Sequence, residues 1–478
     1  MAVLRLDRLS SAGEVLLRAV AAAAARREAW LVGGAVRDAL LRRVPGADVD
    51  VVLPSGALAV GRRVAERTGG AFVLLDAERG AARVVAGDAH LDLADFRAPT
   101  LAGDLAARDF TVNALAVPIR DLLERGSATV IDPTGGLADL RARRLRVPGP
   151  RVLGEDPLRA LRGVRLEAAL GLRLTAGTCS AIRAAAPGLG AVAGERVRDE
   201  VLAVLGLPRA ARALRRMDAL GLLAVILPEA DAMRRCAQPA PHRFNVLEHS
   251  LRAVEAADRL LPCLPALVPL GEELAAHMAG QLGGGLARSV VLKLGALLHD
   301  VSKPETRRLI GGRIRFFEHD LVGARRARQI AARLRLPVRA AATLERLVRH
   351  HLRPMHLEAA GEVTRRARYR FYRDLAEDAR DLLLLALVDA AALTGASPLA
   401  VWRRARLIRD LLGGWQEQHV AAAAAPLVRG EDVMARLNLP PGPSVGRLLA
   451  QVREAQDLGR VATREQALAY LDSLAREP

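Results

Sequence analysis

This chain has few cysteines, few aromatic residues and no long apolar run. Its three cysteines among 478 residues are far apart and form no CxxC pair. A disulfide framework or a zinc knuckle is therefore not implied, and a reducing, cytoplasmic location is expected. No uninterrupted apolar run approaches the roughly 20 residues that a membrane helix needs. The first ten residues mix charge with leucine, which differs from the layout of a signal peptide.

Lysine is almost absent, although the chain is strongly basic. There are 71 Lys and Arg residues against 53 Asp and Glu residues, which gives a formal charge of +18. Only Lys293 and Lys303 are lysines, so nearly all of this positive charge comes from arginine. Solvated helix faces account for part of the excess, and the remainder favours a polyanionic partner such as RNA.

The hydrophobic pattern changes near residue 150. Before it, short β-like runs alternate with helical segments; from Glu155 onward the apolar residues follow the i, i+3, i+4 spacing of helices. The predicted strands are Trp30–Val32, Val49–Leu53, Phe72–Leu75, Arg83–Val85 and Leu91–Leu93. The Ala-rich stretches 19–25 and 421–425 are predicted as helix.

Length and Pro- and Gly-rich breaks indicate several domains. We predict an α+β chain with four segments and no fixed repeat. These are an α/β head (1–150), a helical neck (151–236), a histidine-bearing module (237–400) and a helical tail (401–478).

Two aspartates in the run ADVDVVL are the first candidate site. A strand places residues i and i+2 on one face, so Asp48 and Asp50 point the same way. Two carboxylates at this separation suit Mg²⁺ bound together with substrate phosphates. Upstream, the Gly33-Gly34 pair lies between a strand and a helix start, where free N–H groups can approach an anion. Alone, an Asp-x-Asp pair more often marks a solvated strand end.

Two further head segments join this pair. ARDFTVNALAV (107–117) contains Arg108 and Asp109, which suit a triphosphate clamp and a ribose hydroxyl acceptor; the simpler interpretation is a surface ion pair between them. IDPTGGLADLRARRLRV (131–147) predicts an Asp-Pro turn, a Gly-Gly hinge and a basic strand or helix with a mainly structural role.

GEDPLRALRGVR (154–165) predicts a helix start with Asp156 as N-cap and Pro157 in the first turn. Asp156 and Arg159 form an i, i+3 ion pair in the simpler interpretation. In the functional one, the carboxylate accepts from an exocyclic amine while the guanidinium donates to the adjacent ring nitrogen. Cytosine and adenine present that combination, whereas guanine and uracil present the reverse. GERVRDEVLAVL (194–205) is interpreted as a scaffold helix that holds the preceding one.

The ordered set of motifs resembles the class II tRNA nucleotidyltransferases, the CCA-adding enzymes and their bacterial poly(A) polymerase relatives. The matching segments are GGAVRD (33–38), DVD (48–50), ARDFTVNA (107–114), DPTGGLADL (132–140), EDPLRALRGVR (155–165) and ERVRDE (195–200). The resemblance implies a polymerase-beta-like nucleotidyltransferase head. It implies template-independent addition of C, C and A to the 3′ end of tRNA from CTP and ATP.

By this resemblance, Asp48 and Asp50 hold catalytic Mg²⁺. The implied nucleotide-binding residues are Gly33, Gly34, Arg37, Arg108, Asp109, Asp156, Arg159, Arg162 and Arg165. The family commonly shows Arg-Arg-Asp where this chain has Ala107-Arg108-Asp109, so one phosphate contact is expected to be absent or supplied elsewhere.

Eight of the ten histidines lie between His242 and His356. An apolar helix that ends in His299-Asp300, with a distant histidine upstream and an aspartate downstream, favours a metal site over isolated surface histidines. Histidine nitrogen with carboxylate oxygen suits Mn, Ni, Co, Fe or Zn, with open positions for water and phosphate.

This stretch resembles the HD phosphohydrolase superfamily. The resemblance maps four metal ligands to His249, His299, Asp300 and Asp389. It places Lys303 close by and makes His319 and His350 candidates for outer contacts or a second metal. The implied activity is phosphohydrolysis of RNA ends, and a purely structural or tRNA-binding role is the alternative.

The segment 427–456 resembles the family's C-terminal region. There Gly442-Pro443 interrupts two helices, and arginines such as Arg447 suit tRNA phosphates. Three alternatives to CCA addition stay open. They are a relative that adds only CC, only A or poly(A); an RNA-end phosphohydrolase with a non-catalytic head; and a catalytically silent RNA-binding regulator.

Overall fold

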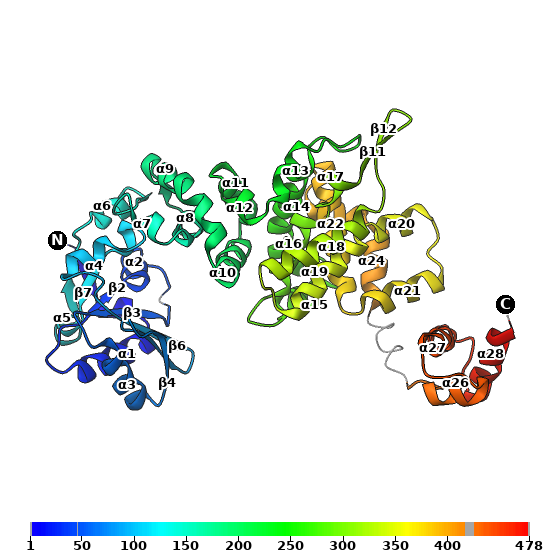
Figure 1. The fold of residues 1–478 in the computed structure, drawn as a ribbon, viewed down its shortest axis with the longest axis horizontal. Coiled ribbons are helices and arrows are strands. Elements are labelled where there is room, and N and C mark those ends of the chain that lie inside the picture. The colour runs from blue at the N-terminus through cyan, green and yellow to red at the C-terminus, as the bar shows by residue number, and fades with distance from the viewer. Residues whose placement is uncertain (1, 45, 416–424, 477–478) are drawn as a thin grey trace. The chain divides into compact units, whose positions relative to one another are not determined.

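The computed structural model describes residues 2–44, 46–415 and 425–476. The chain divides into two compact units, which are described separately (Figure 1). Unit 1 comprises Met1–Val201 and Arg216–Ile226, and unit 2 comprises Leu202–Arg215 and Leu227–Pro478. This division falls inside the predicted neck, so the four-segment division stays a prediction.

A six-stranded sheet in the order β4-β5-β6-β3-β2-β7 forms the centre of unit 1. Its strands are β2 (Trp30–Val32), β3 (Val49–Leu53), β4 (Ala71–Asp76), β5 (Ala81–Ala86), β6 (Ala89–Asp95) and β7 (Ala116–Pro118). All five predicted strands are confirmed, three of them longer than expected. β7 was not predicted as a strand. β3 and β6 are parallel neighbours, whereas the other pairs are antiparallel.

The strand register decides which side chains share a face. Val49 pairs with Leu91 and Val51 with Leu93, all of them buried. The helices α1 (Ser11–Ala24) and α3 (Ala57–Thr68) cover this face, since a Cβ on Gly61 in α3 would lie 3.5 Å from the Leu93 side chain. Because side chains alternate along a strand, the residues between them face the other side of the sheet.

The remaining elements of unit 1 are short strands and helices. The strands are β1 (Val3–Arg5), β8 (Ser127–Thr129), β9 (Arg144–Leu145) and β10 (Arg173–Leu174). The α-helices are α2 (Gly34–Leu40), α4 (Leu101–Ala106), α5 (Ile119–Arg125), α6 (Gly136–Arg141), α7 (Val152–Glu155), α8 (Leu158–Leu170), α9 (Ala176–Ala185) and α12 (Leu222–Ile226). The 3₁₀ helices are η1 (Leu6–Arg8), η2 (Thr111–Asn113) and η3 (Ala186–Ala191). Two further helices, α10 (Gly194–Leu205) and α11 (Ala210–Ala219), contribute residues to both units.

Unit 2 is helical apart from one hairpin, as the apolar spacing predicts. Its helices are α13 (Glu229–Arg235), α14 (Val246–Leu260), η4 (Leu261–Ala266), α15 (Gly271–Ala279), α16 (Arg288–Leu298), α17 (Lys303–Thr306), α18 (His319–Arg333), α19 (Val338–His350), α20 (Arg353–Ala359), α21 (Arg365–Leu375), α22 (Asp378–Thr394), α23 (Pro398–Arg404) and α24 (Arg406–Gly413). The hairpin consists of β11 (Arg307–Ile310) and β12 (Arg313–Phe316). The central helix is α22, whose run Leu382–Leu385 is fully buried. A helix that is apolar all round is typical of a core position.

The C-terminal part of unit 2 forms a small cluster of three helices: α26 (Gly430–Leu437), α27 (Pro443–Asp457) and α28 (Arg464–Arg476). Val433, Val445 and Leu471 are among the residues of its own apolar core. The predicted break at Gly442-Pro443 is confirmed, because α27 begins at Pro443. Of the two Ala-rich stretches, 19–24 lies in α1 as predicted, and 421–424 lies outside the described residues.

In the described part of the chain, no single helix combines the length and apolar composition required to cross a membrane. The consecutive helices α22 and α23, bent by 111°, pass such a test only as a pair and only by length and composition.

Candidate active sites

Asp48 and Asp50 lie at the start of β3, as the sequence predicts. Asp48 precedes the strand with a side chain that is 77% exposed, and its carboxylate lies 2.9 Å from Nδ1 of His90. Asp50 is half-buried on the face away from α1 and α3. Burial raises the pKa of Asp50; the nearby Arg108 guanidinium opposes this, and Asp92 adds to it.

A third carboxylate, Asp92, was missed from the sequence. Parallel pairing of β3 with β6 puts Asp92 directly beside Asp50, and Arg83 on β5 is the next residue in this row. Arg83 donates two hydrogen bonds to Asp92, at 2.7 and 2.8 Å. The alternation of apolar and polar residues in β6 indicates that Asp92 lies on the polar face of this strand. To place Asp92 beside Asp50, one must also know that β3 and β6 are neighbours.

The Gly33-Gly34 turn packs directly against Asp50. Gly33 has φ +73°, and a Cβ there would lie 2.6 Å from Oδ2 of Asp50. The backbone N–H of Gly34 donates to the Asp50 carboxylate. In this structure the turn positions a catalytic candidate, which differs from the free anion cradle that the sequence predicts.

Arg37, a predicted nucleotide contact, is buried and has protein partners. Its Nη1 donates to Oδ1 of Asn113 at 2.6 Å, and its other nitrogens bind Asp38 at 2.9 and 2.7 Å. Arg37 thereby ties α2 to the segment around η2. The structure supports a positioning role for this residue.

Arg108 and Asp109 do not pair with each other, so the simpler interpretation of that dipeptide is wrong. Arg108 donates to Oδ2 of Asp104, one helical turn earlier, at 3.2 and 3.3 Å. Asp109 is buried and lies 3.0 Å from Nε of Arg162. Burial alone would raise the pKa of Asp109, but Arg162 and the N–H donors of Asn113 and Phe110 lower it overall. Asp109 is therefore held in its charged form, and Arg108 lies close enough to Asp50 to lower the pKa of that carboxyl.

The motif 132–140 supports the segment that carries Arg108. The Asp132 carboxylate accepts the N–H groups of Gly136 and Leu137 at 2.8 and 2.9 Å and so caps α6. Buried Asp139 accepts from the Thr111 hydroxyl at 2.8 Å. The predicted structural role of this motif agrees with these contacts.

The predicted base-reading residues lie at the start of α8, with different partners from those expected. Asp156 Oδ2 lies 2.9 Å from Nη2 of Arg196, a residue that the sequence analysis assigned to scaffold. Arg159 donates to the backbone carbonyls of Ala107 and Val152, each at 3.1 Å. The i, i+3 ion pair is therefore absent here.

Helix α8 begins at Leu158, and Pro157 takes the N-cap place predicted for Asp156. The Asp156 side chain nevertheless accepts the Leu158 N–H at 3.3 Å. Pro157 already has helical dihedrals (φ −59°, ψ −22°), whereas Asp156 is extended (φ −144°, ψ 94°), so the Asp156 side chain still caps the first turn.

The other two arginines of α8 differ in their availability. Arg165 makes a two-hydrogen-bond contact with Glu200 of α10 at 2.7 and 3.3 Å, so the predicted scaffold role of 194–205 is supported there. Arg162 contacts Asp109, and its side chain remains about half exposed.

Arg97 is a further charged residue of this region, and the sequence did not point to it. Burial lowers its pKa, and the neighbouring charges of Arg108 and Arg159 lower it further. Arg108 and Arg162 thus place positive charge beside Asp50, and Arg97 lies close to Arg108.

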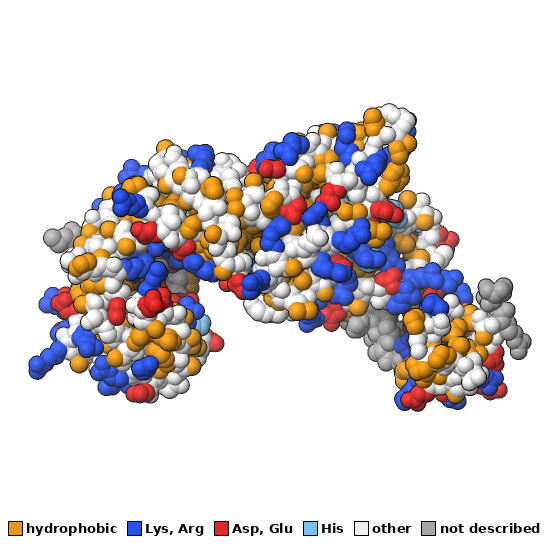
Figure 2. Space-filling model, viewed as in Figure 1, with side chains coloured by type: hydrophobic (Ala, Val, Ile, Leu, Met, Phe, Trp, Pro, Cys, Tyr) orange, Lys and Arg blue, Asp and Glu red, His pale blue; other side chains and the backbone are white. Residues whose placement is uncertain are grey.

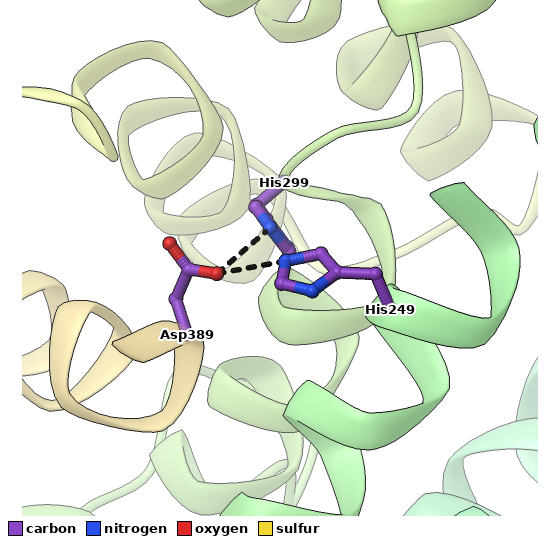
Figure 3. A group of neighbouring side chains, drawn as sticks. All are labelled: His249, His299 and Asp389. Carbon is purple, nitrogen blue, oxygen red and sulfur yellow. Dashed lines mark hydrogen bonds and ion pairs between the residues drawn. The ribbon is translucent and has the colours of Figure 1, made fainter. Parts of the chain in front are cut away.

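Unit 2 contains two groups of metal-compatible side chains, and they are the only such groups of three found among residues 2–44, 46–415 and 425–476. His249, His299 and Asp389 form the first group (Figure 3). Nε2 of His249 and Nε2 of His299 lie 2.8 and 3.5 Å from Oδ1 of Asp389. The three residues come from α14, the end of α16 and α22, so the site joins the main helices of the unit.

Asp300, His319 and His351 form the second group. Oδ1 of Asp300 lies 3.4 Å from Nε2 of His319 and 3.6 Å from Nε2 of His351, while Oδ2 lies 3.3 Å from His299. Asp300 thus links the two groups. The candidate His350 is wrong, because its neighbour His351 occupies this position.

Backbone contacts orient these histidines toward the cluster. Nδ1 of His299, His319 and His351 lies 2.9, 2.8 and 2.7 Å from a backbone carbonyl, so Nδ1 carries the proton. Their Nε2 atoms therefore face inward, and Nε2 of His319 and Nε2 of His351 are only 3.2 Å apart. Two lone pairs at this distance repel each other unless a cation lies near them. The same carbonyl contacts typically orient histidines that bind metals.

The charges of the cluster also suit a cation. Burial alone would lower the pKa of His299, but Asp300 and Asp389 raise it to about 10. Burial alone would raise the pKa of Asp300, but Lys303 and the histidines hold it well below its usual range. Lys303 lies 2.7 Å from Oδ2 of Asp300. Positive charge is therefore strongly favoured in this pocket, and the donor set fits a divalent transition metal.

Three family models match successive parts of the chain. The first is described as the poly A polymerase head domain and matches residues 29–146. The second, a probable RNA- and SrmB-binding site of polymerase A, matches 171–234, and the HD domain matches 246–392. The first match contains both head aspartates, and the third contains both histidine groups.

Curated relatives match over nearly the full length. An A-adding tRNA nucleotidyltransferase of Deinococcus radiodurans is 38% identical over 458 residues, which cover 94% of this chain and 96% of the relative. A CC-adding tRNA nucleotidyltransferase of Thermus thermophilus is 37% identical over 456 residues, covering 93% of each chain.

Solved structures agree with the fold. A CCA-adding enzyme in complex with ATP gives a TM-score of 0.63 at 18% identity and covers 99% of this chain and 100% of that chain. The CCA-adding enzyme of Thermotoga maritima with tRNA gives 0.59 at 18% identity and covers all of both chains. At these identities the likeness concerns the fold, and the predicted α+β architecture with a nucleotidyltransferase head and a helical HD domain is confirmed.

Proposed function

This chain belongs to the tRNA nucleotidyltransferase family, and on that premise we propose that it adds C, C and A to the 3′ end of tRNA from CTP and ATP. The observation that supports this most is the row of Asp50 and Asp92, with Asp48 just before the start of β3 and with Arg108 and Arg162 near Asp50. Carboxylates beside arginines match a metal-bound triphosphate.

Asp48 and Asp50 are proposed to hold Mg²⁺. When bound there, the metal would activate the tRNA 3′-hydroxyl and neutralise charge on the pyrophosphate that leaves. Mg²⁺ usually needs further oxygens from substrate phosphates, which fits a site with few protein ligands. Arg97, Arg108 and Arg162 orient the triphosphate by charge. The 3′-hydroxyl then attacks the α-phosphate in line.

Base selection is proposed to depend on Asp156 and Arg159. An incoming cytosine or adenine donates its exocyclic amine to Asp156 while Arg159 donates to the ring nitrogen. Oδ1 of Asp156 accepts the Leu158 N–H at 3.3 Å and keeps a second lone pair, while Arg159 uses only Nη1 for its two carbonyl contacts. Guanine and uracil would leave these half-buried polar groups unpaired beneath the bound nucleotide, and an unpaired polar group removed from water commonly costs about 1–3 kcal/mol.

The test is incorporation of labelled CTP and ATP into a tRNA transcript that ends before CCA, with sequencing of the product ends. Addition of all three nucleotides supports the proposal. An Asp50→Ala protein is expected to lose incorporation and retain tRNA binding. An Asp88→Ala protein, changed at an exposed aspartate of the same unit, serves as the control.

Partial addition is the second candidate, since relatives that match over nearly the full length include A-adding and CC-adding enzymes. Transcripts that end before CCA, after C and after CC distinguish the cases. A CC-adding enzyme extends the first two with CTP alone, whereas an A-adding enzyme extends only the third.

A second activity, phosphohydrolysis of RNA ends, is proposed for the His/Asp cluster of unit 2. Two adjacent donor groups, linked by the contact of Asp300 with His299, are consistent with a divalent metal site that binds phosphate and water. Hydrolysis of an RNA 2′,3′-cyclic phosphate in the presence of Mn, Ni, Co, Fe or Zn tests it. Absence of hydrolysis and of bound metal would leave the cluster as a structural element.

A further inference from the structure

The β11–β12 hairpin projects from unit 2 and is exposed on nearly all sides. It carries both basic and apolar side chains and stands out from the helices in Figure 2, at the place where Figure 1 labels its strands. Leu309 and Ile310 are 67% and 55% exposed, and Phe317, just after the hairpin, is 59% exposed. An isolated two-stranded hairpin is only marginally stable in water. Packing into a core does not explain these apolar side chains, because they are exposed.

The strand register sorts the side chains onto two faces. Arg308 pairs with Arg315 and Ile310 with Arg313, while Leu309 pairs with Ile314. Because side chains alternate, one face is mainly basic, with Arg308, Arg313 and Arg315 beside Ile310. The other face is mainly apolar, with Leu309, Ile314 and Phe316 beside Arg307. The Gly311-Gly312 turn has φ values of +56° and +74°, as a tight two-residue hairpin requires.

The basic face lacks countercharges. Within the described chain, no ion pair involves Arg307, Arg308, Arg313 or Arg315. Like charges directly opposite each other on adjacent strands are destabilising, as for Arg308 and Arg315. A bound polyanion would remove this repulsion, so charge complementarity points to a phosphate backbone.

Both ends of the hairpin join the His/Asp cluster. β11 follows α17, which begins at Lys303, and β12 ends three residues before His319. The Phe316 carbonyl lies 2.8 Å from Nδ1 of His319, and the Lys303 ammonium lies 5.5 Å from the centre of the Phe316 ring. A nucleic-acid strand bound along the hairpin therefore lies next to the donor groups of the metal-compatible site.

We propose that the β11–β12 hairpin is an RNA-binding arm that holds the sugar–phosphate backbone of a single strand whose end enters the His/Asp cluster. Arginines contact phosphates, and the exposed apolar residues provide surfaces for unpaired bases. The assignment of the strand end to the cluster rests on the proposed phosphohydrolase activity. An anionic membrane surface fits the same charge pattern, but the direct connection to a phosphate-binding cluster favours RNA.

The test compares a triple variant, Arg308→Gln, Arg313→Gln and Arg315→Gln, with a matched control. The control carries Arg325→Gln, Arg403→Gln and Arg404→Gln, which remove the same charge from exposed helix positions of the same unit. Fluorescence anisotropy with a 5′-labelled single-stranded RNA ending in a 2′,3′-cyclic phosphate measures affinity as a function of salt. Each lost phosphate contact should reduce the slope of log K against log salt by about 0.7.

We expect the hairpin variant to bind more weakly, with a slope less steep by about two, and the control to keep the wild-type slope. Nucleotide incorporation into tRNA and metal content should stay unchanged, which verifies folding. A hairpin variant with the wild-type slope overturns the proposal, as does loss of binding to phosphatidylserine vesicles without loss of RNA binding. If wild-type protein hydrolyses no RNA end but the slope falls as predicted, the arm is supported and the phosphohydrolase proposal fails separately.

Discussion

Asp48 of unit 1 and Asp300 of unit 2 illustrate two different ways to place a metal-binding carboxylate. The Asp48 side chain is 77% exposed and contacts His90, whereas the Asp300 side chain is 2% exposed and lies beside Lys303 and four histidines. The head carboxylates form no group of three donors within the described residues, and the His/Asp cluster forms two.

This difference agrees with what each site is proposed to receive. Nucleotidyl transfer brings together a nucleoside triphosphate and a tRNA end, so part of the metal's ligand set comes from phosphates and the protein side must stay open. A hydrolytic centre activates water, and it is served by a complete set of preoriented protein donors. The head site is thus completed by its substrates, and the unit 2 site by its own fold.

Replacement of the linking carboxylate should separate the two centres most clearly. Asp300→Ala removes a donor of the second group and the carboxylate that links this group to His299 of the first. It also leaves the buried Lys303 without its carboxylate partner, and breaking a buried ion pair typically costs about 3–5 kcal/mol of stability. We expect loss of bound metal, loss of RNA-end hydrolysis and a lower melting temperature of unit 2. Asp410→Asn, at an exposed position of the same unit, is the control. Metal content equal to wild type would contradict the assignment of Asp300.

The adjacent histidines at the end of α19 provide a matched pair. His351→Ala should weaken metal binding about 10- to 100-fold, the range seen when groups around a metal site are removed. His350→Ala should leave it unchanged, because that side chain belongs to neither donor group. Titration of each apoprotein with Mn²⁺ or Zn²⁺ measures the difference. Equal effects of the two substitutions would show that the second group binds no metal.

The Gly33-Gly34 turn of the head site allows a corresponding comparison of two substitutions in unit 1. Gly33→Ala introduces a Cβ that would lie 2.6 Å from the Asp50 carboxylate, at a φ of +73°. Strain of about 1–3 kcal/mol at such a position should reduce nucleotide incorporation by roughly 10- to 100-fold. Gly69→Ala has a similar φ of +65° but nothing within 4 Å. It should therefore lose stability alone, and an equal loss of activity there would show that backbone strain is the sole cause.

The smallest expected effect concerns base selection. Arg196→Ala frees the Asp156 carboxylate, whereas Arg159→Ala removes the proposed donor to the ring nitrogen. We expect Arg159→Ala to increase incorporation of GTP and UTP relative to CTP and ATP several-fold. Arg196→Ala should change mainly the rate. Competition assays with mixed nucleotides measure both, and the opposite pattern would assign base selection to Arg196.

Much of the fold followed from local patterns. Short β-like runs predicted the positions of five strands, all of which are present. The i, i+2 alternation of strand side chains predicted that Asp48 and Asp50 share a face. The i, i+3, i+4 spacing of apolar residues from Glu155 onward predicted that the rest of the chain is mostly helical. These features depend on neighbours in sequence, which a single chain displays directly.

The missed residues depend on contacts between distant segments. Asp92 required the parallel pairing of β3 and β6, and Arg196 required the approach of α10 to the start of α8. His351 could have been identified from the sequence, because Leu344, Leu347, Val348 and His351 follow the buried i, i+3, i+4, i+7 face of α19. His350 lies off that face.

The reciprocal measurement on the two centres tests the account most directly. Asp48→Ala and Asp300→Ala proteins are each assayed for nucleotide incorporation into tRNA and for RNA-end hydrolysis, with tRNA affinity as the folding control. We predict that Asp48→Ala loses incorporation by about a thousandfold or more, roughly 4 kcal/mol in the barrier, and keeps hydrolysis. Asp300→Ala should show the reverse. Incorporation by Asp48→Ala at the wild-type rate would contradict the assignment of the head as the polymerising site.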